Sequence, residues 1–397
     1  MDLPVPNFRT IRGDHGLWVI DATGRKRARL PLSAVDDSGS LRPPVVANLA
    51  ENGFLDRTAQ EAYAVTALTS TACNLGCAYC YQNIEQSPSS PSRPPRIANS
   101  NLDQADIREI TRFVRKQMLA NDFAAVTLLL FGGEPLLNPD ACVALLDAFG
   151  ELNLVYADMI TNGTLLTGHL AARLAVVGLR AMQITYDGGR ESHDKIRVTR
   201  AGLGTFDLIN KRVKSAVSAA DFSWTVRINV SPRSAETLIP LAESIASTYP
   251  PGRSAAYFSP VFDYGIGYEG SLQYSDDLVM ALTTAGRILM RSGIKLKYQP
   301  VARSCPYCGV KAGKTGAVIN ADGTLYSCWA TAGHEGLDVG HVSSGFVADD
   351  VLSPRWQSCE SGIQEKVASI SVKEFQDRVD FALLEAEAEL RKSANEA

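Results

Sequence analysis

The chain has 397 residues, of which 45% are hydrophobic and 21% are charged, and its formal net charge is −4. This composition is typical of globular proteins, and the length suits one large domain with appendages or two to three ordinary domains. The weakly acidic balance, without a prominent run of Lys or Arg, argues against a nucleic-acid partner. A secretory signal and an apolar run of the roughly 20 residues that span a membrane are both missing from the sequence. We therefore expect a cytoplasmic protein without a membrane partner.

Residues 1–60 form the first segment, expected to be a small α+β cap. Residues 17–30 (LWVIDATGRKRARL) predict a β-hairpin with its turn at ATGR. Residues 45–55 (VVANLAENGFL) predict a short helix that ends at Gly53.

Residues 61–300 alternate short β-rich runs with longer helical patterns, which predicts parallel strands joined by helices. The strands are expected at 64–70, 125–131, 155–161, 181–187, 223–230 and 255–261, and the helices at 103–120, 139–150, 165–177, 205–220, 234–247 and 275–293. Six such units are fewer than the eight of a closed barrel. The expected fold is therefore α/β, an open, partial (β/α)6 barrel of the TIM type.

Unusual motifs follow the first four of these strands. CNLGCAYC (73–80) comes after the first, FGGEP (131–135) ends the second, TNG (161–163) ends the third, and DGG (187–189) ends the fourth. In parallel βα folds the carboxyl ends of the strands meet at one rim, where active sites are built. The four motifs are expected to converge there. Between them, the Ser- and Pro-rich residues 87–96 predict a mobile loop, either a lid or a plain insertion.

Seven of the eight cysteines fall into two groups, and Cys142 is expected to be a small buried core residue. In a cytoplasmic protein these thiols are not expected to form disulfides. The first group is Cys73, Cys77 and Cys80. Three thiolates on one loop can ligate three irons of a [4Fe–4S] cluster, whereas a structural zinc site needs a fourth ligand and no His lies nearby in the sequence.

Several motifs in order then resemble the radical SAM superfamily. CNLGCAYC resembles its CxxxCxΦC signature, in which the aromatic Φ is here Tyr79, and FGGEP is similar to its GGEP motif. TNGTLLT (161–167), ITYDGGRESHDKIR (184–197) and GLGTFDLI (202–209) resemble stretches of the SPASM/twitch branch. The resemblance covers about residues 45–360.

This resemblance implies roles for individual residues. The fourth iron of the cluster would chelate S-adenosylmethionine (SAM), and Glu134 would pair with the methionine ammonium. Tyr79 would lie near the adenine, Thr185 would face the ribose or the carboxylate, and Arg197 would either pair with the carboxylate or only hold a loop. Gly132 and Gly133 would let the backbone approach closely where a side chain would clash. The catalytic proton donor or acceptor is not predicted.

The second cysteine group lies in residues 301–362. A CxxC at Cys305 and Cys308 precedes a hairpin with its turn at NADGT (320–324), which closes on Cys328, and Cys359 follows. By count, four cysteines suit a zinc site. By resemblance, the pattern matches the opening of SPASM and twitch domains and implies one auxiliary [4Fe–4S] cluster on these four cysteines. No cysteine follows Cys359, so a second auxiliary cluster is not expected. Residues 363–397 predict a charged, solvated C-terminal helix.

The N-terminal pattern looks like that of radical SAM maturases of ribosomally synthesised peptides. The resemblance therefore implies an oxidoreductase that cleaves SAM reductively to a 5′-deoxyadenosyl radical and abstracts hydrogen from a precursor peptide. The product would carry a C–C, ether or thioether crosslink or a related modification, and the electron donor would be a flavodoxin or ferredoxin. Residues 1–60 would dock the peptide or only cap the barrel. Three alternatives stay open: a small-molecule radical SAM dehydrogenase of antibiotic biosynthesis, a sulfatase-type maturase, and a non-catalytic Fe–S or zinc-binding module.

Overall fold

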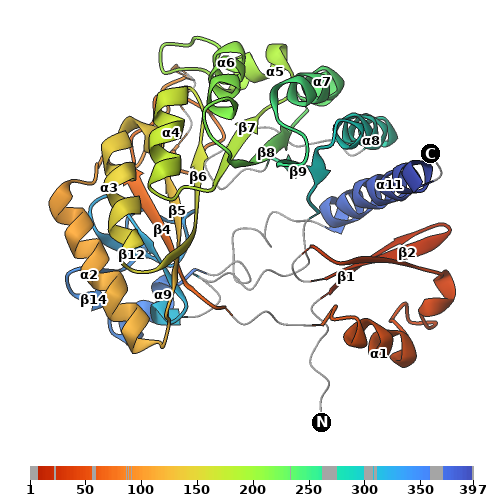
Figure 1. The fold of residues 1–397 in the computed structure, drawn as a ribbon, viewed down its shortest axis with the longest axis horizontal. Coiled ribbons are helices and arrows are strands. Elements are labelled where there is room, and N and C mark those ends of the chain that lie inside the picture. The colour runs from red at the N-terminus through yellow and green to blue at the C-terminus, as the bar shows by residue number, and fades with distance from the viewer. Residues whose placement is uncertain are drawn as a thin grey trace.

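The computed structural model describes residues 8–21, 24–55, 60–85, 87, 89–90, 92–232, 234–261, 275–298, 307, 311–357 and 370–395. Its main feature is one sheet with the strand order β10-β9-β8-β7-β6-β5-β4-β11-β12-β13-β14. From β4 to β10 every pair of neighbouring strands is parallel. Figure 1 shows that this part of the sheet curves, with helices along its outer side.

The expected partial barrel is confirmed. Its strands are β4 (Tyr63–Ser70), β5 (Val126–Gly132), β6 (Leu154–Thr161), β7 (Ala181–Tyr186), β8 (Ser223–Val230), β9 (Ser254–Pro260) and the short β10 (Lys295–Leu296). The helices between them are α2 (Gln104–Ala120), α3 (Pro139–Gly150), α4 (Gly168–Val176), α6 (Phe206–Val217), α7 (Leu238–Thr248) and α8 (Asp276–Arg291). A short helix α5 (Arg190–Ile196) after β7 was not expected from the sequence.

The main core lies between the strands and the outer helices. Successive side chains of a strand point to opposite faces, and in β6 and β8 one set, including Met159 and Val226, is fully buried in this core. Cys142 of α3 is also fully buried there, as predicted. The alternate positions are half-buried or exposed and include polar residues, for example Asp158 of β6 and Thr225 of β8.

The hairpin predicted at the second cysteine group is present, and it extends the barrel sheet. β11 (Gly316–Ile319) pairs in parallel with β4, and β12 (Thr324–Tyr326), β13 (Asp338–His341) and β14 (Gly345–Phe346) follow as antiparallel strands. The turn between β11 and β12 needs Gly323, whose φ is +82°. The helix α9 (Asp349–Arg355) comes next. The division of the chain into domains at residues 60, 300 and 362 stays a prediction.

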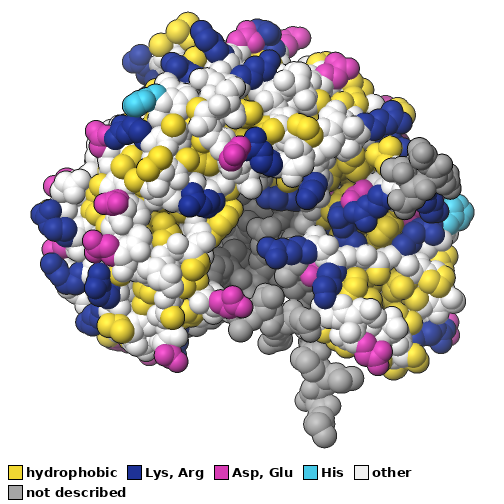
Figure 2. Space-filling model, viewed as in Figure 1, with side chains coloured by type: hydrophobic (Ala, Val, Ile, Leu, Met, Phe, Trp, Pro, Cys, Tyr) yellow, Lys and Arg dark blue, Asp and Glu magenta, His cyan; other side chains and the backbone are white. Residues whose placement is uncertain are grey.

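The N-terminal segment is a three-stranded antiparallel sheet, β1 (Phe8–Gly13), β2 (Gly16–Asp21) and β3 (Arg27–Leu30), followed by α1 (Pro43–Glu51). The hairpin and helix agree with the sequence pattern, and β1 adds a strand that was not expected. Figure 2 shows Lys and Arg side chains on the sides of this part and of the barrel that face each other.

The expectation of a solvated C-terminal helix is wrong for α11 (Ile370–Asn395). Its residues Phe375, Val379, Leu383 and Leu384 are buried, and Figure 1 shows the helix lying beside α8 and the N-terminal sheet. The acidic residues of α11 are bound by arginines of that sheet: Arg9 lies 2.5 Å from both Asp377 and Asp380. The charges that suggested a solvated surface thus form ion pairs that hold α11 against the N-terminal sheet.

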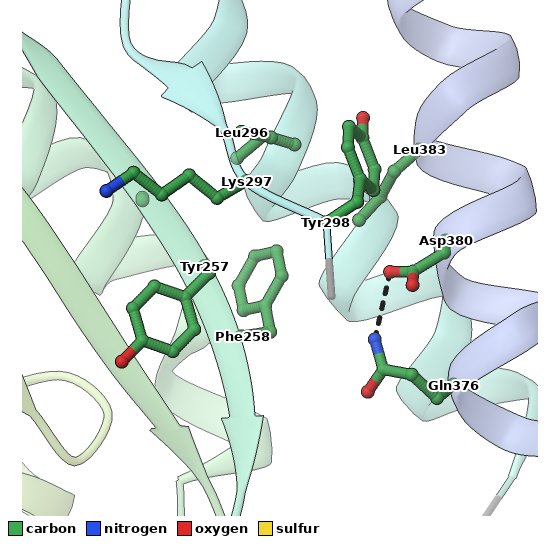
Figure 3. A pocket seen from close by; sticks show the side chains of 9 residues that line it. Tyr257, Phe258, Leu296, Lys297, Tyr298, Gln376, Asp380 and Leu383 are labelled. Carbon is green, nitrogen blue, oxygen red and sulfur yellow. Dashed lines mark hydrogen bonds between the residues drawn. The ribbon is translucent and has the colours of Figure 1, made fainter. Parts of the chain in front are cut away.

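Figure 3 shows the contact of α11 with the barrel end. Gln376 and Asp380, joined by a hydrogen bond of 2.9 Å, border a small cavity whose opposite wall carries Phe258 and Tyr298. Lys297 points away from α11, toward the barrel interior, where its Nζ donates to Thr225 Oγ1 at 2.8 Å. Among the helices of the described residues, none is long and apolar enough to cross a bilayer.

Candidate functional site

The first cysteine group lies on the irregular loop that follows β4. Cys73, Cys77 and Cys80 are all partly exposed, and none forms a disulfide. They are close enough to interact electrostatically with one another. Burial raises the pKa of Cys73 and raises that of Cys77 to about 12. Without a metal these two thiols hold their protons, so metal binding would have to release them.

The donor set fits an iron–sulfur cluster. Among the described His, Cys, Asp and Glu side chains, no three converge as the ligands of a single metal ion do. In a cluster each thiolate binds its own iron, so the ligands surround the cluster and do not share one ion. Cys73, Cys77 and Cys80 would be these ligands.

The GGEP turn packs directly on the backbone that leads into the cysteine loop. A Cβ on Gly133 would lie 2.3 Å from the carbonyl oxygen of Ala72, and one on Gly132 would lie 2.1 Å from that of Ser70. Gly132 also has φ +145°, a conformation that other residues rarely adopt. Both glycines are therefore required for this close approach, as the sequence predicted.

Glu134 is fully buried, and the third strand supplies most of the groups that hold it. Thr161 Oγ1 donates to its Oε1 at 2.6 Å, and the backbone N–H of Asn162 donates to its Oε2 at 2.7 Å. The backbone N–H of Leu136 donates to Oε1 at 3.0 Å. A carboxylate has about four acceptor sites, and these contacts use three of them. One acceptor site is left without a hydrogen-bond donor among the described residues.

Tyr79 lies at the centre of a buried polar network. Its hydroxyl donates to Asp187 Oδ2 at 2.8 Å and accepts from Arg197 Nη1 at 2.8 Å and from Asn229 Nδ2 at 2.9 Å. Asn229 also donates to Asp187 Oδ1 at 3.1 Å, and Arg197 lies 3.7 Å from Asp187. Burial raises the pKa of Asp187, and Arg197 opposes that shift. The network ties the cysteine loop to the ends of β7 and β8.

The other two predicted SAM contacts lie on the same side of the sheet. Thr185 is buried on β7, opposite Arg227 of β8, and precedes Asp187 by two residues on the same face. Arg197 ends α5 and holds Tyr79 in place. Its Nε is buried without a hydrogen-bond partner. Arg197 thus holds Tyr79 of the cysteine loop, and its Nε–H has no acceptor among the described residues.

Two residues of this region were missed from the sequence alone. Asn229 completes the Tyr79 network, and Arg96 donates from Nη1 to Cys80 Sγ at 3.4 Å. The only signal for Asn229 was its position near the end of a barrel strand. Arg96 gave no signal, because it closes the Ser- and Pro-rich loop, which the pattern treats as an insertion.

Residues 68–219 match the family model described as the radical SAM superfamily. The chain carries a radical SAM domain. The matched segment begins inside β4 and ends just after α6, so it contains the cysteine loop, the GGEP turn and Arg197. The expected resemblance to this superfamily is confirmed for this segment.

Two curated relatives extend the similarity. The AdoMet-dependent heme synthase of Methanosarcina barkeri is 28% identical over 169 residues, 42% of this chain and 42% of that protein. The mycofactocin maturase MftC of Mycobacterium tuberculosis is 25% identical over 287 residues, 69% of this chain and 66% of the maturase. The chain thus spans less than half the length of the first relative and about two thirds of the second.

A solved structure agrees with the fold. AnSMEcpe with bound AdoMet and a Kp18Cys peptide superposes with a TM-score of 0.57 at 15% sequence identity. The match covers 82% of this chain and 99% of that one. At this identity the similarity shows the fold alone.

Of the second cysteine group, the structure describes Cys328 alone; Cys305, Cys308 and Cys359 lie outside the described residues. A row of aromatic rings joins the turn after Cys328 to the radical SAM cysteine loop. Tyr81, next to Cys80, stacks on Phe131 with ring centroids 6.5 Å apart, and Phe131 lies 6.0 Å from Trp329, next to Cys328. His334 Nε2 also bonds the carbonyl oxygen of Tyr81 at 2.8 Å. The fold therefore places the turn that follows Cys328 in contact with the first cysteine loop.

Proposed function

We propose that this chain is a radical SAM enzyme that modifies a ribosomally synthesised peptide. The observation that carries the proposal is the cysteine loop of Cys73, Cys77 and Cys80 beside the buried, incompletely used carboxylate of Glu134. A [4Fe–4S] cluster with SAM, when bound there, would supply a 5′-deoxyadenosyl radical by one-electron cleavage of the sulfonium bond.

The residues of the chain would bind and orient these groups. Glu134 would accept an N–H of the methionine ammonium with its remaining site, a charge-assisted hydrogen bond. Arg197 Nε would donate to the methionine carboxylate, and Thr185 would line the same ligand. Tyr79 would be held beside the adenine by its network with Asp187. Their burial would keep water away from the radical.

A peptide substrate is supported by the relatives. MftC is a maturase by name, and the anSMEcpe structure contains a bound peptide. The heme synthase points to another substrate class, but it matches a smaller part of the chain. The modification would be a C–C, ether or thioether crosslink or a related change, and residues 1–60 would dock the precursor peptide.

An auxiliary [4Fe–4S] cluster on Cys305, Cys308, Cys328 and Cys359 belongs to the same proposal, with 301–362 as its twitch-like domain. It would accept an electron from the product radical or anchor the peptide. The electron for SAM cleavage would come from a flavodoxin or ferredoxin. The location would be cytoplasmic, as the sequence predicts.

The first test is reductive cleavage of SAM. Protein reconstituted anaerobically with iron and sulfide, then reduced with dithionite, should convert SAM to 5′-deoxyadenosine. The variant Cys73/Cys77/Cys80→Ala should lose this activity and keep about four of roughly eight irons. Activity in that variant would contradict the proposal, and retention of all irons would contradict the two clusters. Metal binding without SAM cleavage by the unmodified protein would favour a non-catalytic module.

The second test addresses the substrate. Each short peptide encoded beside the gene is incubated with the reduced enzyme and SAM, and its mass is measured. We expect one of them to lose two hydrogens while 5′-deoxyadenosine accumulates. If all stay unchanged and an aminosugar is oxidised in the same assay, the small-molecule dehydrogenase is the correct alternative.

A further inference from the structure

Arg96 is fixed beside the cysteine loop by the backbone around it. The loop that begins after Ile84 returns to its starting point: Ile84 N–H donates to the carbonyl oxygen of Pro95 at 2.8 Å, and Ile97 N–H donates to that of Gln82 at 3.1 Å. Asn83 and Arg96 form a β-bridge between these two bonds. The short antiparallel pairing begins two residues after Cys80. It therefore places Arg96 directly against that cysteine.

The guanidinium group of Arg96 faces the thiols. Nη1 donates to Cys80 Sγ at 3.4 Å, and Nη2 donates to Gln82 Oε1 at 2.8 Å and to the carbonyl oxygen of Thr71 at 3.4 Å. No described carboxylate forms an ion pair with Arg96, and its Nε is buried without a partner. Once these cysteines bind a metal as thiolates, Cys80, Cys73 and Cys77 would supply negative charge beside this guanidinium group.

The partly buried positive charge of Arg96 would be stabilised by a negatively charged group bound at the cysteine loop. Burying a cation without a counter-charge is costly, and among the described residues the groups beside Arg96 that could become anionic are the three thiols. Arg also presents several donors in a fixed plane and keeps its charge at any physiological pH. A cluster held by three thiolates would supply the missing negative charge, which extends the fit between this loop and a cluster.

The reduction potential of an iron–sulfur cluster depends on its net charge and on hydrogen bonds to its sulfur atoms. Reduction moves one electron from the donor to the cluster, with no bond made or broken in the protein. The added negative charge is stabilised by a nearby cation, more strongly in a partly buried site than in water. Both effects of Arg96, its charge and its N–H···S bond, act in the same direction.

We propose that Arg96 raises the reduction potential of the cluster on Cys73, Cys77 and Cys80 and so makes it reducible by the physiological donor. The inference rests on the proposed function, since it needs the cluster. It assigns a role to the end of the Ser- and Pro-rich loop: this segment places a positive charge that sets the reduction potential of the cluster.

The test is a redox titration of the reconstituted enzyme, followed by electron paramagnetic resonance of the reduced cluster. In Arg96→Met the ratio of reduced to oxidised cluster at a fixed potential should fall about tenfold, which equals a shift of about 59 mV for one electron. Arg96→Lys keeps the charge and should lie between this variant and the wild type. An unchanged potential in Arg96→Met with full iron content would overturn the inference.

Arg93→Met is the matched control. Arg93 lies in the same loop and carries the same charge, but it is exposed and its Nε donates to the carbonyl oxygen of Arg200 at 2.7 Å. Its removal should leave the potential unchanged, and an equal shift in both variants would show a general charge effect and refute a specific role of Arg96.

Two further outcomes are decided in advance. If Arg96→Met fails to load iron, Arg96→Lys and Arg96→Gln are compared, and equal potentials in this pair refute the inference. If the wild type itself binds no cluster or cleaves no SAM, the proposed function fails. If it does both and the potentials do not differ, only the role of Arg96 fails.

Discussion

Replacing Glu134 with Gln tests whether the buried carboxylate binds the SAM ammonium. Oε1 accepts from Thr161 and Leu136, and Gln can keep both contacts with its own oxygen. Its amide nitrogen then faces the backbone N–H of Asn162, which loses its acceptor. One unsatisfied buried donor costs about 1–3 kcal/mol. The removal of a buried charge offsets part of this, because burial raises the pKa of Glu134 and so disfavours its ionised form.

The effect on SAM should be larger than the effect on folding. A hydrogen bond to a charged group contributes about 1.5–3 kcal/mol, and each 1.4 kcal/mol is about a factor of ten in affinity. We expect Glu134→Gln to weaken SAM binding about 10- to 100-fold, measured by equilibrium dialysis with the reconstituted enzyme. Thr161→Val is the matched control, since it removes a donor to the same carboxylate but keeps its charge, and should cost less than tenfold.

Affinity within twofold of the wild type in Glu134→Gln would refute the role of the carboxylate. Thermal unfolding of both variants without SAM completes the comparison. The alternative outcome is that SAM affinity and unfolding temperature both fall, and by the same amount in Glu134→Gln and Thr161→Val. The carboxylate would then only support the local fold, and the acceptor site that its three contacts leave open would bind no ligand.

Three other predictions concern stability and assembly. Burial is the chief reason that the pKa of Asp158 is raised from 3.8 to about 6. The ionised carboxylate therefore destabilises the fold above about pH 6, and this penalty vanishes below about pH 4. In urea unfolding, Asp158→Asn should increase the free energy of unfolding by about 1–3 kcal/mol at pH 8 and leave it unchanged at pH 4. Equal effects at both pH values would contradict this. Gly133→Ala should prevent iron loading, because its Cβ would meet backbone oxygens at 2.3 and 2.4 Å, whereas Gly150→Ala meets nothing within 4 Å and should load normally. Arg9→Met removes the ion-pair partner of a buried aspartate of α11 and should lower the free energy of unfolding in urea by about 3–5 kcal/mol. Arg29→Met removes the partner of a half-exposed ion pair and should lower it by only about 0–1 kcal/mol. Equal losses of unfolding free energy in the two variants would show that burial of the ion pair is irrelevant.

The barrel strands could be placed from the sequence because their signal is local. The expected run 223–230 coincides with β8, and 64–70 differs from β4 by one residue. Alternation of side chains and turn residues act over a few positions, so a short window contains the information. The same holds for the cysteine loop and the GGEP turn, whose spacing along the chain already restricts their chemistry.

The helix α11 shows where this approach fails. Its pattern of charges is that of a solvated surface, but its acidic residues meet arginines that lie more than three hundred positions away, among them Arg9 with Asp380. The sequence does not reveal whether a charged side chain is solvated by water or paired with a distant side chain of opposite charge. The pairing of β11 with β4 is likewise a long-range contact, and it joins the second cysteine group to the barrel.

The sequence by itself determined the partial barrel, the loop of Cys73, Cys77 and Cys80, and the carboxylate of Glu134. The barrel follows from the periodicity of hydrophobic residues, and the loop and the carboxylate follow from the spacing of their motifs. Only the tertiary structure decided what surrounds them. Asn229 and Arg96 reach the cysteine loop from a barrel strand and from the end of an irregular loop, and no local pattern relates them to the cysteines. Contacts of this kind arise when the sheet curves and brings these polar groups together, so their chemistry is recognised only in the folded chain.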